Sequence, residues 1–215
     1  TSLPGLYAAG ECACVSINGA NRLGSNSLTE LLVFGSRAGR NAADFALMHD
    51  LSDTRSLEQQ VEEVAVRVKN LLNNESGGDE KIAVLRDEMT ASMERGAGIY
   101  RDAESLGKTC EQLIDLRKRY GSLQLDDSTR KHNTELRSAL ELDFLLDVAQ
   151  SVAFSAVARK ESRGSHQRTD YPERDDESYL AHSLAYYRGL GEKPEIKYKD
   201  VVVTKWPPGD RVYGN

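Results

Sequence analysis

The residues best suited to chemistry lie in one loop near the start of the chain, SINGANRLGSNSLTEL at 16–31. The loop is rich in Gly, Asn and Ser and holds a single cation, Arg22. Ser27 followed by Glu30 has the spacing of a capping box, which predicts a helix that begins at Ser27. The free backbone N–H groups of such a helix end suit an anion or an electron-rich carbonyl. Arg22 is therefore either a solvated loop residue or a bidentate partner for a carboxylate.

The segments on either side of this loop would have to position it. LYAAGE at 6–11 predicts a strand that ends at Glu11, where dinucleotide folds commonly place a carboxylate against ribose hydroxyls. Strand, terminal Glu, loop and helix together favour a bound dinucleotide or flavin, although no GxGxxG is present and a purely structural loop stays an alternative. The helix after the loop carries large and then small apolar residues, so we expect it to be buried. The C-x-C pair of Cys12 and Cys14 predicts small buried strand residues rather than a zinc site.

Composition limits the class of protein. The 215 residues carry a net charge of -6, which argues against a nucleic-acid surface as the main role. Three cysteines are too few for a disulfide framework, and no apolar stretch approaches the roughly 20 residues of a membrane span. The chain opens on a predicted strand, and the sequence offers few other strands before residue 195 that could pair with it. We therefore expect a C-terminal piece of a longer, cytosolic or peripheral protein.

Apolar periodicity predicts a helical bundle between about 52 and 158. Breaks are expected at NNESGGDE, 73–80, and at the glycines of 96–98, and N-caps for the fourth helix at Asp126, Asp127 or Ser128. That helix is apolar around much of its girth, so we expect it at the centre of the bundle. The predicted helix faces are Val61, Val64, Val68 and Leu71; Ile82, Leu85, Met89 and Met93; Leu106, Cys110, Leu113 and Tyr120; and Leu136, Leu140, Phe144, Val148, Val152 and Val157.

The last part of the chain changes character. From 161 it is dense in charge and aromatic residues, which indicates an irregular segment held by a salt-bridged structural network. EIKYKDVVVTK, 195–205, alternates and predicts one or two strands, which Pro207 and Pro208 would end. The residues expected in the network are Arg163, His166, Arg168, Asp170, Glu173, Arg174, Asp175, Asp176, Glu177 and His182.

Two long motifs resemble a known family. GLYAAGECACVSINGANRLGSNSLTELLVFGSRAG is similar to the flavin-binding segment of succinate dehydrogenase and fumarate reductase flavoprotein subunits, and SRGSHQRTDYPERDDESYLAHSL is similar to their C-terminal segment. The resemblance covers essentially the whole chain. It implies a mainly α fold with three parts: the C-terminal strand–loop–helix of an α/β FAD-binding domain (1–50), an antiparallel helical bundle (51–160) and a small irregular and β region (161–215).

The resemblance also implies roles for individual residues. Arg22 matches the arginine that holds a carboxylate of succinate or fumarate, and Glu11 matches the acidic residue at the FAD ribose. Asn26, Ser27 and Leu28 match the helix start whose backbone meets the flavin ring, where the helix end would favour negative charge on a reduced flavin. Asn18 stands where the family commonly has His, and we expect it to preserve the loop and to shift substrate preference.

The implied activity is hydride transfer between a C4 dicarboxylate and FAD. The partners would be an iron-sulfur subunit and, through it, a membrane anchor, which places the protein peripherally at the cytoplasmic face. The proton-shuttling arginine and the flavin-attachment histidine of the family have no counterpart here. We therefore expect no catalytic residue and no metal ligand in these residues, and no activity from this piece alone. The alternatives are an L-aspartate oxidase-like flavoenzyme and a non-catalytic helical interaction module.

Overall fold

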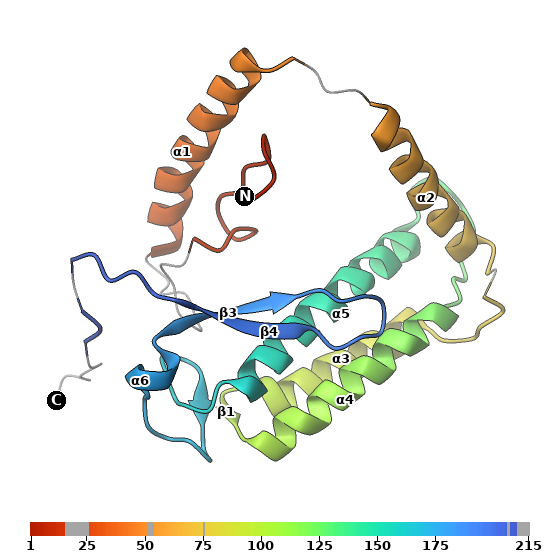
Figure 1. Ribbon diagram of the computed structural model, residues 1–215. Helices are drawn as coiled ribbons and strands as arrows, with labels where there is room; N and C mark the ends of the chain where they lie inside the picture. Colours follow the sequence, from red (N-terminus) through yellow and green to blue (C-terminus); the bar gives the residue numbers. More distant parts are fainter. Residues whose placement is uncertain (16–25, 51–53, 75, 206, 210–215) are drawn as a thin grey trace.

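The computed structural model describes residues 1–215 apart from 16–25, 51–53, 75, 206 and 210–215 (Figure 1). The described chain is mainly helical, as the sequence predicts. Its elements in order are α1 (Asn26–Met48), α2 (Arg55–Leu72), α3 (Ile82–Ala97), β1 (Tyr100–Arg101), α4 (Ala103–Arg119), the 3₁₀ turn η1 (Tyr120–Ser122), α5 (Thr134–Ala158), β2 (Gln167–Arg168), α6 (Asp176–Tyr179), β3 (Ala181–Tyr186) and β4 (Glu195–Asp200).

The hydrophobic core lies in a bundle of α3, α4 and α5, in which consecutive helices run in opposite directions (Figure 1). Its core is mostly leucine and alanine, and its fully buried side chains include Leu85, Leu106, Leu113, Leu116, Ala139, Leu142, Leu146 and Ala153. The predicted faces of α3 and α4 are confirmed, because their members are buried or packed against the core. The breaks at 73–80 and at the end of α3 are confirmed as well.

α2 joins the bundle by its C-terminal half only. Val68 and Leu71 pack against the core, and Leu72 is buried within it. Val61 and Val64, predicted on the same buried face, are 66% and 59% exposed. The predicted face is therefore right at Val68 and Leu71, near the C-terminal end of the helix, and wrong at Val61 and Val64.

α5 differs from its prediction at both its start and its face. It begins at Thr134, where the Asn133 side chain accepts a hydrogen bond from Leu136 N at 2.7 Å, rather than near Asp127. Asp127 instead closes a local turn by accepting from Thr129 N at 2.8 Å. Its buried face carries Ala139, Leu142, Leu146, Ala149 and Ala153. Of the predicted face, Leu136 and Val157 pack against the core, whereas Phe144, Val148 and Val152 are 63%, 59% and 41% exposed. The helix is central, and its predicted face is right near the two ends and wrong between them.

The N-terminal part differs more strongly from prediction. Residues 6–11 form no strand in the described chain, because no described neighbour offers them a hydrogen-bonded ladder. The segment lies beside α1 (Figure 1). There Gly5 and Gly10 adopt φ of +80° and +86°, and a Cβ at these positions would lie 2.9 Å from the ring of Phe45 and 2.4 Å from Leu31. Cys12 and Cys14 are exposed, so the prediction of buried strand cysteines is wrong.

The C-terminal region contains two small sheets. β1 pairs in parallel with β2, and β3 pairs antiparallel with β4, from Ala181 opposite Asp200 to Tyr186 opposite Glu195. Of the one or two strands predicted over 195–205, one is confirmed as β4, and 201–205 form no strand. β3 lies in the segment predicted to be irregular, and the pairing with β4 is what makes it a strand. No helix in the described part of the chain is long and apolar enough to cross a membrane.

Candidate functional site

Only some residues of the predicted site lie in the described part of the chain. Arg22 and Asn18 fall in 16–25, so their roles stay predictions. Glu11 is exposed and lies in a turn in which Ala13 N donates to Gly10 O at 2.9 Å. An exposed carboxylate in a turn is accessible to a ligand, as a ribose-binding role requires.

The start of α1 gathers the other three predicted residues on one helical turn. Ser27 already lies within α1, whose described residues run from Asn26, so the prediction that Ser27 caps the helix is wrong. Asn26 is exposed, Ser27 is half-buried and Leu28 is 71% exposed. The first turn contains no acidic residue, so no carboxylate within it opposes the partial positive charge of the helix end.

The body of α1 contradicts the expectation of a buried helix. Leu28, Leu32, Leu47 and Met48 are between 71% and 86% exposed, and Glu30 is the residue of this helix that is buried. Gly35 and Gly39 have nothing within 4 Å of the position of a Cβ atom. The helix thus presents a largely uncovered apolar surface.

The most densely connected group of charges lies in the C-terminal region and centres on Glu161. This carboxylate is fully buried and accepts hydrogen bonds from Arg159 Nη1 at 2.5 Å, from Arg163 Nε at 2.8 Å and from Asp175 N at 2.9 Å. Burial opposes its ionisation, but the hydrogen bonds from Arg163, the Asp175 amide and Arg159 outweigh burial and hold the pKa of Glu161 below its ordinary value. Arg163 also binds Asp176 at 2.6 Å, and the network therefore ties the end of α5 to α6.

A second part of the network links two helix ends through Arg168 and Asp170. Arg168 Nη1 donates to the carbonyls of Ala156 and Val157 at 3.2 and 3.3 Å, at the C-terminus of α5. Its Nε and Nη2 hold both oxygens of Asp170 at 2.7 Å, and Asp170 Oδ2 accepts from Ala103 N at the start of α4. A cation thus meets one helix C-terminus and an anion meets one N-terminus. The hydrogen bond from Arg168 lowers the pKa of Asp170 to about 2.

His166 connects this network to β1. Arg101 Nη1 lies 3.0 Å from His166 Nδ1, and Arg159 O lies 3.1 Å from its Nε2. Burial, together with the charges of Arg101, Arg168 and Arg159, holds the pKa of His166 below its ordinary value. The salt-bridged structural network predicted from sequence is confirmed for Arg163, Arg168, Asp170, Arg174 and Asp176.

A third charged cluster fastens α2 to the bundle. The buried Asp143 of α5 accepts from Arg117 of α4 and pairs with Arg67 of α2. Arg117 is 3% exposed, and its Nε lies 3.2 Å from Asp147. One aspartate therefore holds cations from two other helices.

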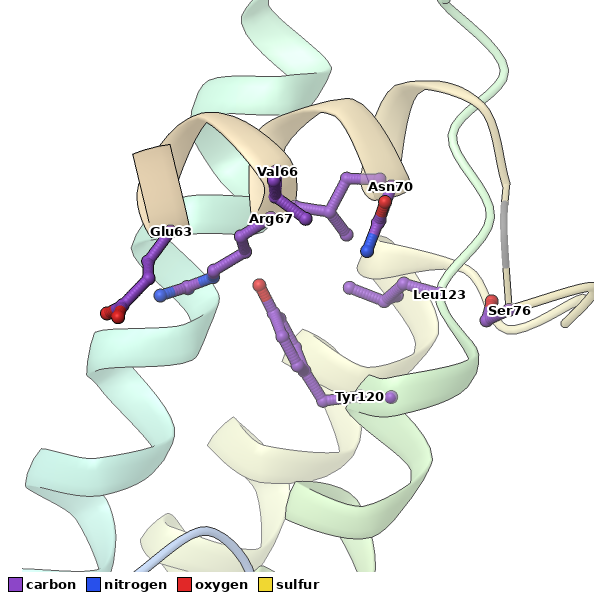
Figure 2. Close-up of a pocket in the computed structure, with 9 residues that line it drawn as sticks. Glu63, Val66, Arg67, Asn70, Ser76, Tyr120 and Leu123 are labelled. Atoms are coloured by element: carbon purple, nitrogen blue, oxygen red, sulfur yellow. The ribbon is translucent and has the colours of Figure 1, made fainter. Parts of the chain in front are cut away.

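Beside that cluster, a pocket of about 290 Å³ opens between α2 and η1 (Figure 2). Figure 2 shows the Tyr120 hydroxyl pointing toward Arg67 across it. Tyr120 donates to Ala139 O at 3.0 Å and Arg67 is paired with Asp143, so the protein itself supplies partners for both groups. The pocket is an open groove of the helical bundle and lies in a different part of the chain from the predicted ligand site.

Sequence reasoning missed several residues that the structure makes central. Asp143 and Arg117 are charged positions on otherwise apolar helix faces, and such an interruption of the pattern could have identified them as a buried pair. Glu161 is the first residue of the segment predicted to hold the network, two residues before Arg163, but it is not among the residues expected in that network. Arg101 is far from the network in sequence and carries no signal of its own. In the described residues, no group of His, Cys, Asp and Glu is arranged to hold a metal ion.

Two family models match this chain, one at its start and one over its C-terminal part. The family model described as fumarate reductase flavoprotein C-term matches residues 86–213, and the FAD binding domain model matches residues 1–28. The fumarate reductase flavoprotein subunit of Mycobacterium tuberculosis H37Rv is 52% identical over 217 residues, which is 100% of this chain and 37% of the relative. The succinate dehydrogenase flavoprotein subunit of Rickettsia conorii is 40% identical over 97% of this chain and 36% of the relative.

The fold also matches that of a solved structure over almost the whole of this chain. The chain superposes on an Escherichia coli quinol fumarate reductase with a TM-score of 0.90 at 44% identity, over 98% of this chain and 36% of that one. The chain therefore spans a little over a third of the length of these proteins.

Proposed function

Because this chain belongs to the fumarate reductase flavoprotein family, we propose that it is the C-terminal part of a subunit that transfers a hydride between a C4 dicarboxylate and FAD. The observation that carries the proposal is the order of the two matches. An FAD-binding segment at 1–28 precedes the flavoprotein C-terminal segment at 86–213. Both succinate dehydrogenases and fumarate reductases are relatives. By microscopic reversibility, the proposed site would serve either direction of the reaction.

The described residues fit the proposed cofactor contact. FAD, when bound, supplies the hydride-accepting and hydride-donating chemistry. Asn26, Ser27 and Leu28 offer an accessible helix end whose first turn has no competing carboxylate, and Glu11 offers an exposed acceptor for ribose hydroxyls. Arg22 would hold a substrate carboxylate through its two-pronged guanidinium group.

The proposed partners follow from the relatives. The solved relative from Escherichia coli is named a quinol fumarate reductase, and we infer that electrons would pass between a quinol and FAD through a membrane anchor and an iron-sulfur subunit. The flavoprotein would then lie peripherally at the cytoplasmic face of the membrane. The 215 residues alone would show no succinate-dependent dye reduction, because the chemistry would need groups from the remaining two thirds of the subunit.

The decisive test is Arg22→Ala in the full-length flavoprotein. Loss of a bidentate charged contact should lower kcat/KM for succinate on the order of 10²- to 10³-fold while bound flavin, read from its visible absorbance, is unchanged. Arg22→Lys keeps the positive charge but loses the bidentate geometry of the guanidinium group, so its kcat/KM should lie between those of wild type and Arg22→Ala. Arg130→Ala, at an exposed position of the loop before α5, is the matched control. Unchanged kcat/KM in Arg22→Ala with normal flavin content would contradict the proposed substrate role.

A further inference from the structure

The partners of His166 fix its protonation state. A guanidinium N–H can only donate, so the 3.0 Å contact from Arg101 requires that Nδ1 has no proton. A carbonyl oxygen can only accept, so the 3.1 Å contact with Arg159 O requires that Nε2 carries the proton. His166 is therefore the neutral Nε2–H tautomer, at 4% exposure.

The groups facing this imidazole come from three segments. Arg101 arrives from β1, Arg159 follows the end of α5, and Arg168 lies on β2. The nearby carboxylates bind these arginines, since Glu161 binds Arg159 and Asp170 binds Arg168. A proton added to His166 would thus place a fourth positive charge among three.

We propose that His166 is a proton-sensitive lock that holds β1 and β2 together and fastens the C-terminal region to the end of the bundle. A proton on Nδ1 turns an acceptor into a donor and sets it against the Arg101 guanidinium. Arg101 is also backbone-paired with this region, because Thr169 N donates to Arg101 O at 2.8 Å. Displacement of its side chain therefore loosens the Tyr100–Arg101 and Gln167–Arg168 strand pair.

The sign of the pH effect follows from the surroundings. Burial and the three arginines keep the pKa of His166 below 6.5 in the folded state, so the unfolded or opened state takes up the proton first. The contribution of this histidine to stability is present above that value and is lost as pH falls toward the folded pKa. Asp170 stays ionised down to about pH 2 and Glu161 is also held ionised, so they do not respond in the same window.

The test is hydrogen–deuterium exchange on the full-length flavoprotein at about pH 7.5 and about pH 5.5, after correction for the intrinsic rates. Three proteins are compared: wild type, His166→Gln and His182→Gln. A glutamine amide can accept from Arg101 and donate to Arg159 O but does not titrate, so it imitates the neutral imidazole. His182, half-buried on β3, is the other histidine of the region and serves as the matched control.

Wild type and His182→Gln should both exchange about tenfold faster at the lower pH in peptides that cover 98–103 and 165–170, as the loss of one charge-assisted hydrogen bond implies. His166→Gln should show no such acceleration. Flat exchange in wild type, or an equal response in His166→Gln, overturns the proposal. If His166→Gln does not fold, the NMR titration midpoint of the wild-type His166 ring must coincide with the exchange midpoint, and a mismatch overturns it instead.

Discussion

Replacement of Glu161 by glutamine is the sharpest test of what holds the C-terminal region in place. The carboxylate is fully buried and accepts four hydrogen bonds, three of them from the guanidinium groups of Arg159 and Arg163 at 2.5, 2.8 and 3.0 Å. The fourth comes from Asp175 N at 2.9 Å. Glutamine preserves the size of the side chain but removes its charge and turns an N–H₂ group toward guanidinium donors.

The cost can be bounded from what each arginine keeps. Loss of one partner of a buried ion pair typically costs about 3–5 kcal/mol. Arg163 retains Asp176 at 2.6 Å, and Arg159 retains the carbonyl of Tyr179 at 2.8 Å, so neither charge is left wholly without compensation. We therefore expect about 2–4 kcal/mol, which corresponds to a fall in amide protection of about 30- to 700-fold.

The assay is native-state hydrogen exchange in the full-length protein, read from peptides that cover 159–180. Glu104→Gln provides the control, because it removes an exposed pair with Lys108 on α4 and should leave those peptides unchanged. Protection in Glu161→Gln equal to that of wild type would refute the reasoning. It would mean that backbone pairing and α6, rather than the buried carboxylate, hold the region.

Two further predictions concern the bundle. Gly96→Ala would place a Cβ 2.1 Å from Thr109 Oγ1, where α3 and α4 approach closely, and should destabilise the bundle by about 1–3 kcal/mol; an unchanged thermal unfolding midpoint would contradict the close packing. Asp143→Ala leaves Arg117 buried without its principal partner and releases Arg67, so it should cost about 3–5 kcal/mol and expose α2 to limited proteolysis. A proteolytic pattern identical to that of wild type would show that the apolar contacts of α2 suffice.

The helices that were predictable from sequence are those with one continuous apolar face. α3 and α4 each bury a stripe at helical spacing, so periodicity alone located them. For α5, periodicity did not identify the buried face, because two faces of this helix are apolar. Its inward face carries Leu142 and Leu146 as well as Ala139 and Ala153 and leaves Phe144 outside, and no local pattern encodes that choice.

Local chemistry was also ambiguous at the start of α5. Asp127 and Asn133 are both good caps, and each does accept a backbone hydrogen bond. Glu135 decides between them, because its carboxylate accepts from Asp126 N and Asp127 N at 2.9 and 2.8 Å and holds the preceding loop in a turn. That contact spans eight or nine residues and is not visible to a rule that reads adjacent positions.

The charged network was predictable in kind but not in its connections. Density of opposite charges indicated ion pairs, yet the pairing depends on segments that are distant in sequence. Arg168 reaches α5 carbonyls eleven and twelve residues away, and Asp170 reaches the amide of Ala103 across 67 residues. Of the candidate ligand site, the accessibility of Glu11 and of the start of α1 is now described, while the roles of Arg22 and Asn18 rest on sequence.

The apolar surface of α1 is exposed although its sequence predicts burial. Its sequence has the large-to-small pattern of a buried helix, yet Leu28, Leu32 and Leu47 are mostly exposed and Gly39 borders open space. The cysteines at 12 and 14 likewise read as buried and are exposed. A sequence encodes burial for the whole protein in which it evolved, and this chain spans about 37% of its relatives. On the proposed function, the part of the subunit outside these residues would both cover α1 and complete the flavin site, and the errors of burial and the incompleteness of the site would then have one cause.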